Sequence, residues 1–231
     1  MSAKFGSLFL FNTYRPMALT DIGRKRALKH ELPAFIDGSC RREPDFQMNH
    51  PSISALCRKG HFAPKLDVGH SIVYCAKKEQ YKSNTPFWCL VAMLKVIQRF
   101  ENHNDAAAWY LKNEGRLPSN CMVSGNQPQD FDKTLGFKNP NKRNDFSQNP
   151  RLLERWDNDY RKRAQLNPDF LACDIIEIER TDPFVITSEM VSDECPSHSL
   201  PNSFLNHYHI TEDDWEWFRN VFQTGKRLSE Y

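Results

Sequence analysis

The chain has 231 residues, of which 39% are hydrophobic and 26% are charged, as in a folded globular protein rather than a disordered one. Its 31 lysines and arginines nearly balance 29 aspartates and glutamates, so any surface that binds a polyanion must be local. No apolar run approaches the roughly 20 residues that cross a bilayer. Phe5–Phe11 lacks a cleavage pattern, so we expect neither a membrane segment nor a secretory signal.

The cysteines indicate a reducing compartment. There are seven of them, an odd number with irregular spacing, and Cys75 and Cys89 fall inside apolar runs. Buried, reduced thiols explain this pattern better than a disulfide framework does. We therefore expect a cytoplasmic protein.

The N-terminal part begins with a short predicted strand, Leu8–Tyr14. The very basic stretch Asp21–His30 follows as one turn or helix, and Cys40–Phe46 has the composition of a polar loop. Alternation of apolar and polar residues then predicts a half-buried strand that begins at Ser52.

Two longer apolar runs continue the predicted sheet. Ser71–Ala76 is apolar on both faces, as in a fully buried strand. Phe87–Ile97 is long enough to be a buried helix, but its β-branched residues and the nearby turn signals favour a strand. Further short strands are expected at Ile175–Ile178 and Phe184–Thr187.

Three helices have clear signals. We expect Asn104 to cap a helix over Asp105–Lys112, and Pro150 to open a second helix that ends at Leu166. Thr211 opens a third helix, which carries an aromatic stripe of Trp215, Phe218 and Phe222. Between the first two helices, 118–149 reads as a long surface loop, a type of segment that is often functional.

The sequence contains few patterns typical of catalysis or metal binding. His207 and His209 place two imidazoles on one side of a strand, but no third ligand is evident, so we predict no metal site and no cofactor. Cys57 lies beside Arg58 and Lys59, which favour a thiolate, although a buried strand cysteine is the simpler interpretation.

Features suited to nucleic acid are more numerous. The turn from Arg58 and Lys59 to Phe62 combines cations for phosphates with a ring for stacking on a base. Trp88 and Trp109 can wall a pocket for an unstacked base, and the pair at 41–42 can extend a basic patch. Each of these features also has a structural explanation, as solvated surface or as core packing.

A resemblance supports the nucleic-acid interpretation. Phe62-Ala-Pro, followed by Leu66-x-Val-Gly-His70 and Ile72-Val-Tyr74, resembles the strand-entry element of PUA-like domains. The run Trp88–Arg99 is similar to the long returning strand of the EVE and YTH branches. The Phe-Ala-Pro turn is closer to the nucleotide-modification-associated domains, a PUA-like set linked to DNA hypermodification.

This resemblance covers about residues 8–123 and has two departures. His70 stands where the family usually has Asp, and the chain from Ser124 onward resembles no part of EVE or YTH domains. The resemblance implies a β-barrel with a base-binding pocket at its open face. We expect that pocket to be lined by Ser54, Arg58, Lys59, Phe62, Trp88, Trp109 and Asn120.

The sequence thus predicts an α+β fold: a PUA-like mixed β-barrel at 1–123 with flanking helices, and an extension at 124–231 packed on the same domain. The expected function is binding of nucleic acid or nucleotide, DNA or RNA, with recognition of a modified or flipped base, most simply in DNA.

Two alternatives stay open. One is an enzyme, a transferase or hydrolase acting on a modified base through Cys57, His61 or the loop near Asp130. The other is a protein-interaction module that uses the aromatic C-terminal helix. The oligomeric state is left open.

Overall fold

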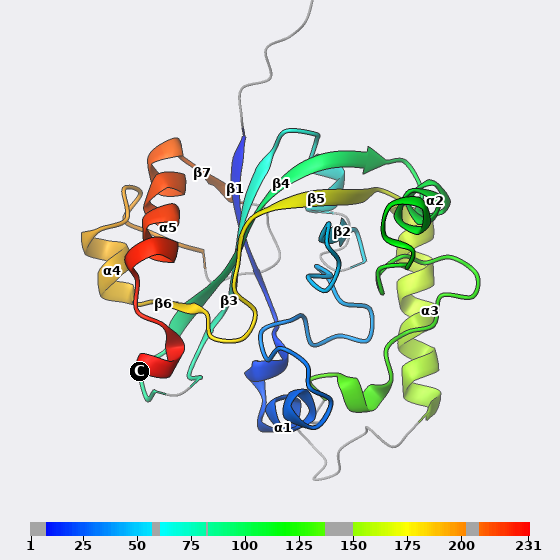
Figure 1. The fold of residues 1–231 in the computed structure, drawn as a ribbon, viewed down its shortest axis with the longest axis horizontal. Coiled ribbons are helices and arrows are strands. Elements are labelled where there is room, and N and C mark those ends of the chain that lie inside the picture. The colour runs from blue at the N-terminus through cyan, green and yellow to red at the C-terminus, as the bar shows by residue number, and fades with distance from the viewer. Residues whose placement is uncertain (1–7, 57–60, 82, 137–149, 202–207) are drawn as a thin grey trace, which may run out of the picture.

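The computed structural model describes residues 8–56, 61–81, 83–136, 150–201 and 208–231. Within them lie one mixed sheet and five α-helices (Figure 1). The strands are β1 (Phe9–Tyr14), β2 (Ser52–Ser54), β3 (Ser71–Glu79), β4 (Phe87–Phe100), β5 (Phe170–Ile178), β6 (Phe184–Ile186) and β7 (Tyr208–Ile210). The helices are α1 (Asp21–Lys29), α2 (His103–Glu114), α3 (Pro150–Leu166), α4 (Ser188–Asp193) and α5 (Glu212–Thr224). No helix in these ranges is both long and apolar enough to cross a bilayer.

The sheet is curled but open. Its strand order is β2-β5-β4-β3-β1-β7, with β6 paired to the first part of β4. β2 and β7 form the two ends, and within the described ranges they do not pair with each other. The expected α+β class is therefore observed, whereas the expected barrel is not closed. The strands after residue 124 belong to the same sheet, because β5 and β6 pair with β4 and β7 pairs with β1.

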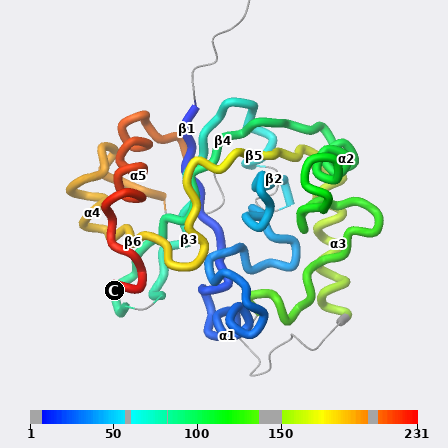
Figure 2. The backbone as a smooth tube through the Cα atoms, in the orientation of Figure 1, coloured from blue at the N-terminus to red at the C-terminus, as the bar shows by residue number. Residues whose placement is uncertain are grey.

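The two faces of the sheet pack against different parts of the chain. Along β3, Ile72 and Tyr74 belong to a core formed with the segment 34–66, while Val73 and Cys75 belong to a core formed with α4 and α5. This alternation follows from the two-residue period of a strand. Figure 2 shows the chain between α1 and β2 running between the sheet and α3.

The aromatic stripe of α5 faces the sheet. Trp215 lies against Phe9, with ring centroids 5.2 Å apart, and Phe218 stacks on Phe11 at 5.7 Å. Both side chains are buried, and Phe222 is partly buried in the same core. The stripe is thus used within the fold, which argues against the interpretation of α5 as a docking surface for another protein.

Several local predictions agree with the structure. The apolar run at Phe87–Phe100 is a strand, as predicted, and not a buried helix. β3 pairs along one edge of this strand, and β5 and β6 pair along the other. Thr211 caps α5 in a reciprocal capping box, and Gly115 ends α2 with φ 70°. The cap of α2 was misplaced: Asn102, not Asn104, accepts the backbone N–H of Asp105, at 2.9 Å.

The two loop predictions need correction. Residues 40–46 form neither a helix nor a strand, as the prediction of a polar loop requires, but they are buried throughout. The expected surface loop 118–149 begins with the buried residues Ser119, Asn120 and Cys121, and later forms a short 3-10 turn, Phe131–Lys133. Residues 41–45 and Ser119 are buried because they pack against each other, as described below, whereas residues 124, 125, 127 and 130 are exposed as predicted.

Candidate functional site

The segment Cys40–Asp45 buries four charged side chains close together in sequence. Arg41 and Arg42 are 0% exposed, Glu43 is 1% exposed and Asp45 is 3% exposed. Charged groups are almost never buried to this extent unless they are paired and hydrogen-bonded, because loss of hydration is costly. We call these four residues the charged hub, and their partners define the candidate site.

Glu43 joins β2 to the chain that follows α2. Its carboxylate accepts the backbone N–H of Ser54 at 2.9 and 3.1 Å, and it also accepts the Ser54 hydroxyl. The Asn120 amide donates to the same carboxylate at 3.1 Å. One buried carboxylate therefore brings together two residues that the sequence predicted to read a base.

Asp45 makes a parallel connection. The backbone N–H and the hydroxyl of Ser119 both donate to Asp45 Oδ2 at 2.8 Å. The Ser52 hydroxyl donates to Asn120 Oδ1 at 2.7 Å. The Ser52 side chain therefore points toward Asn120 and the Ser54 side chain toward Glu43, and Ile53 between them points into the core.

Arg41 connects the hub to α3. Its Nε donates to Asp157 at 2.6 Å, and its two terminal nitrogens donate to the carbonyls of Ser119 and Asn126 at 2.9 and 3.0 Å. Asp157 also accepts from Arg161 Nε at 3.0 Å. A planar guanidinium offers five donors in a fixed fork, which explains how one side chain can hold three acceptors.

Arg42 points toward α1. It donates to the backbone carbonyls of Asp37 and Lys133, the latter at 3.0 Å. Burial lowers the pKa of Arg42, and the negative charges of Asp45 and Asp37 oppose that shift. Burial raises the pKa of Asp37, against hydrogen bonds from Ser39.

The predicted aromatic residues do not converge. Phe62 is buried near Tyr74, with centroids 6.2 Å apart, in the core beside β2. Trp88 lies in the core on the other face of the sheet, below the Lys78 ammonium. Trp109, on α2, contacts Phe100 and His50. Of the predicted set, only Ser54 and Asn120 share a direct partner among the described residues, and Arg58 and Lys59 lie outside them.

Residues named for other chemistry are also dispersed. His61 and Asp130 are both exposed. Cys57 and His207 lie outside the described residues. Burial raises the pKa of Cys40 and Cys121 to about 12, so both are thiols at neutral pH. No group of three potential metal ligands occurs in the described ranges.

Arg41 and Arg42 are the hub residues that the sequence placed only in a surface patch, and their burial rules out that role. Glu43, Asp45 and Ser119 were not singled out at all. The available signal was the mixture of both charge signs within six residues, just before a strand. Surface patches for polyanions carry one sign, whereas a buried network needs both.

His103 borders this network and makes stability depend on pH. Its Nδ1 accepts the Met122 N–H at 3.0 Å, and burial, followed by the charge of Arg41, lowers its pKa to about 4. The unfolded chain therefore binds a proton between pH 6.5 and 4 that the folded protein excludes. We expect His103 to account for a loss of roughly 2–3 kcal/mol of unfolding free energy across this interval.

Urea unfolding at pH 7 and pH 5 tests this prediction. His103→Phe should show a smaller difference between the two pH values than the wild type does. His61→Gln, which changes an exposed histidine, should keep the wild-type difference. Equal pH dependence in the wild type and His103→Phe would contradict the prediction.

Glu43 of the hub, together with Asn120 and the two serines of β2, brings a carboxylate, an amide and two hydroxyls together on one side of β2. These are the donor and acceptor types that pair with the edge of a nucleobase.

Comparisons of the chain with protein-family models, with curated proteins and with solved structures find no match.

Proposed function

We propose that the protein binds nucleic acid or a nucleotide and reads a modified or flipped base with Ser54 and Asn120 beside Glu43. The observation that supports this proposal is the convergence of both residues on one buried carboxylate. Two residues chosen for base recognition, from distant parts of the chain, are thereby held in a fixed relative position.

The chemistry of the three groups suits this role. A carboxylate accepts hydrogen bonds from an exocyclic amine, and an amide both donates and accepts along a base edge. In the protein without a base these groups satisfy one another. A base that enters exchanges one set of hydrogen bonds for another, so its net affinity depends on how well its edge matches.

The curled sheet supports the proposal of a PUA-like arrangement. In that arrangement a β-barrel carries a base-binding pocket at one open face. Here the chain between α1 and β2 runs between the sheet and α3 (Figure 2), and β2 and β7 do not pair with each other within the described ranges. We propose that a flipped or single-stranded base enters from an open side, in DNA or in RNA.

Arg58 and Lys59 follow β2 closely in sequence and supply phosphate contacts in this proposal. We expect Arg58→Ala to weaken binding of a single-stranded oligonucleotide roughly 5- to 10-fold at low salt. The slope of log K against log salt should fall by about one, as expected when one phosphate contact is lost. Fluorescence anisotropy at several salt concentrations measures both quantities.

Arg219→Ala is the matched control, since it removes the same charge from α5, which covers the opposite face of the sheet. Its affinity and salt slope should stay close to those of the wild type. If neither variant alters binding, the turn at 58–59 does not contact phosphate. If the wild type itself shows no salt-dependent binding, the proposed function is wrong.

A further inference from the structure

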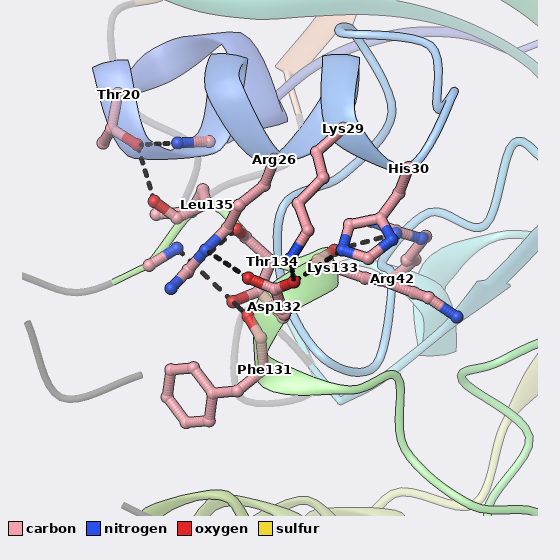
Figure 3. Close-up of polar contacts among 12 residues, drawn as sticks. Thr20, Arg26, Lys29, His30, Arg42, Phe131, Asp132, Lys133, Thr134 and Leu135 are labelled. Atoms are coloured by element: carbon pink, nitrogen blue, oxygen red, sulfur yellow. Dashed lines mark hydrogen bonds and ion pairs between the residues drawn. The ribbon is translucent and has the colours of Figure 1, made fainter. Parts of the chain in front are cut away.

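A second cationic feature lies on α1. Lys29 Nζ and His30 Nε2 approach Asp132 Oδ2 at 2.5 and 2.7 Å, and Arg26 Nε lies 3.5 Å from Oδ1. Figure 3 shows these three side chains pointing from the helix toward one carboxylate on the turn Phe131–Lys133. Lys25 is exposed one helical turn before Lys29. We call 25, 26, 29 and 30 the α1 cationic face.

The charges on this face are unequal. At neutral pH its lysines and arginine carry three positive charges, and Asp132 supplies one negative charge. Hydrogen bonds from Lys29 and then His30 lower the pKa of Asp132 to about 2, so the carboxylate is ionised under ordinary conditions. Several cationic side chains here donate to the two oxygens of one carboxylate, and proteins bind the oxygens of a phosphate group in the same way.

The Lys29–Asp132 part of this contact is open to solvent, whereas the side chains of His30 and Arg26 are 24% and 9% exposed. The Lys29 side chain is 64% exposed and that of Asp132 is 46% exposed. Exposed ion pairs contribute little to stability, because water already solvates both partners and long side chains lose freedom. An incoming anion can therefore exchange with Asp132 at small cost to the fold.

The turn that carries Asp132 does not depend on this contact. Arg42 donates to the carbonyl of Lys133 at 3.0 Å, and the backbone N–H of Leu135 donates to Gly38 at 2.9 Å. The Thr20 hydroxyl donates to the carbonyl of Leu135 at 2.5 Å. These bonds keep the turn against α1 when the carboxylate side chain rotates away.

We propose that the α1 cationic face binds a backbone phosphate of the nucleic acid, and that Asp132 occupies this phosphate site in the free protein. The inference rests on the proposed function and adds a second phosphate contact to it. Asp132 then acts as an internal competitor, so that only a ligand with enough further contacts displaces it. Binding of isolated phosphate is suppressed, whereas binding of a longer strand is not.

The decisive comparison is Asp132→Asn with Asp130→Asn. Both substitutions remove one negative charge from the same turn, but among the described residues the Asp130 carboxylate pairs with Lys133, at 3.7 Å, rather than with the α1 face. With a fluorescein-labelled 20-nucleotide single-stranded DNA, we expect Asp132→Asn to lower the Kd about tenfold and to steepen the salt slope by about one. Asp130→Asn should change the Kd less than threefold.

Adding Lys29→Ala to Asp132→Asn should return the Kd toward the wild-type value. Should Asp132→Asn fold poorly, Lys29→Glu in the wild-type background tests the same site. It should weaken binding at least tenfold, whereas Lys112→Glu, an equal charge change at an exposed position late in α2, should have a small effect.

The outcomes separate the two proposals. If the wild type binds the oligonucleotide but Asp132→Asn and Asp130→Asn shift the Kd equally, the α1 site is wrong and the proposed function stands. If the wild type binds no oligonucleotide at any salt concentration, both are overturned.

Discussion

Arg41→Met is expected to lower the free energy of unfolding by about 4 kcal/mol, since removing one partner of a buried ion pair leaves the other uncompensated. Arg41 is fully buried and donates to Asp157 and to the carbonyls of Ser119 and Asn126. Met fills part of the space but offers no donor. Two carbonyls and one carboxylate oxygen then lose their partner, and Asp157 keeps only Arg161. Urea unfolding followed by tryptophan fluorescence measures the loss.

Arg161→Met is the control for this prediction. It removes a guanidinium from the same carboxylate, but the Arg161 side chain is 39% exposed. An exposed i,i+4 pair contributes about 0.3–0.5 kcal/mol, so the two variants should differ by several kcal/mol. A similar loss in both would show that the bond to Asp157 sets the effect, not the burial of Arg41 or its carbonyl contacts.

Both substitutions lie at the charged hub and its partner Asp157, the part of the molecule that the sequence predicted least well. The helices and the long strand β4 carry their own signals: caps at Thr211 and Gly115, and an apolar run with β-branched residues from Phe87 onward. Such signals are local, so a single sequence is enough to recognise them. The cap of α2 was misplaced by two residues because two asparagines stand next to its first turn.

The charged hub has no local signal of burial. Arg41 and Asp157 are 116 residues apart, and Glu43 and Asn120 are 77 residues apart. Within its own segment, each of these side chains reads as solvated surface. The opposite charge or the amide that offsets the lost hydration of each buried charge comes from a distant segment, which only the tertiary fold brings near. The same reason explains why the predicted aromatic residues do not lie together. Phe62 and Trp88 pack in the cores on opposite faces of the sheet. The periodicity of one segment cannot show on which face of the sheet a residue from another segment lies.

The open sheet also has a physical explanation. β2 has only three residues and pairs with β5, while β7, equally short, pairs with β1 at the other end. Neither edge is long enough to continue the ladder around the curl. The chain between α1 and β2 runs between the sheet and α3 instead (Figure 2), and its carboxylates Glu43 and Asp45 hold it to Ser54 of β2 and to Ser119. The architecture thus depends on buried charges where a closed barrel would depend on strand pairing.

Glu43 has a structural role and, in our proposal, a role in binding, so its substitution has the second large expected effect. Glu43→Ala removes the acceptor of the Ser54 N–H, the Ser54 hydroxyl and the Asn120 amide. Each buried donor left without a partner costs about 1–3 kcal/mol, and we expect a total loss of about 4 kcal/mol in urea unfolding. Ser54→Ala, which removes one hydroxyl, should cost about 1 kcal/mol.

Glu43→Gln separates the two roles, because the side chain keeps its shape and loses its charge. One carboxylate oxygen becomes an amide that faces other donors, so unfolding free energy should fall by roughly 2 kcal/mol while the fold is kept. Salt-dependent binding through phosphates should persist in this variant, whereas discrimination between a modified and an unmodified base should fall at least tenfold. Competition between matched oligonucleotides measures that ratio. A Glu43→Gln protein that discriminated as well as the wild type would exclude the carboxylate from base reading and leave it as the brace between β2 and Asn120.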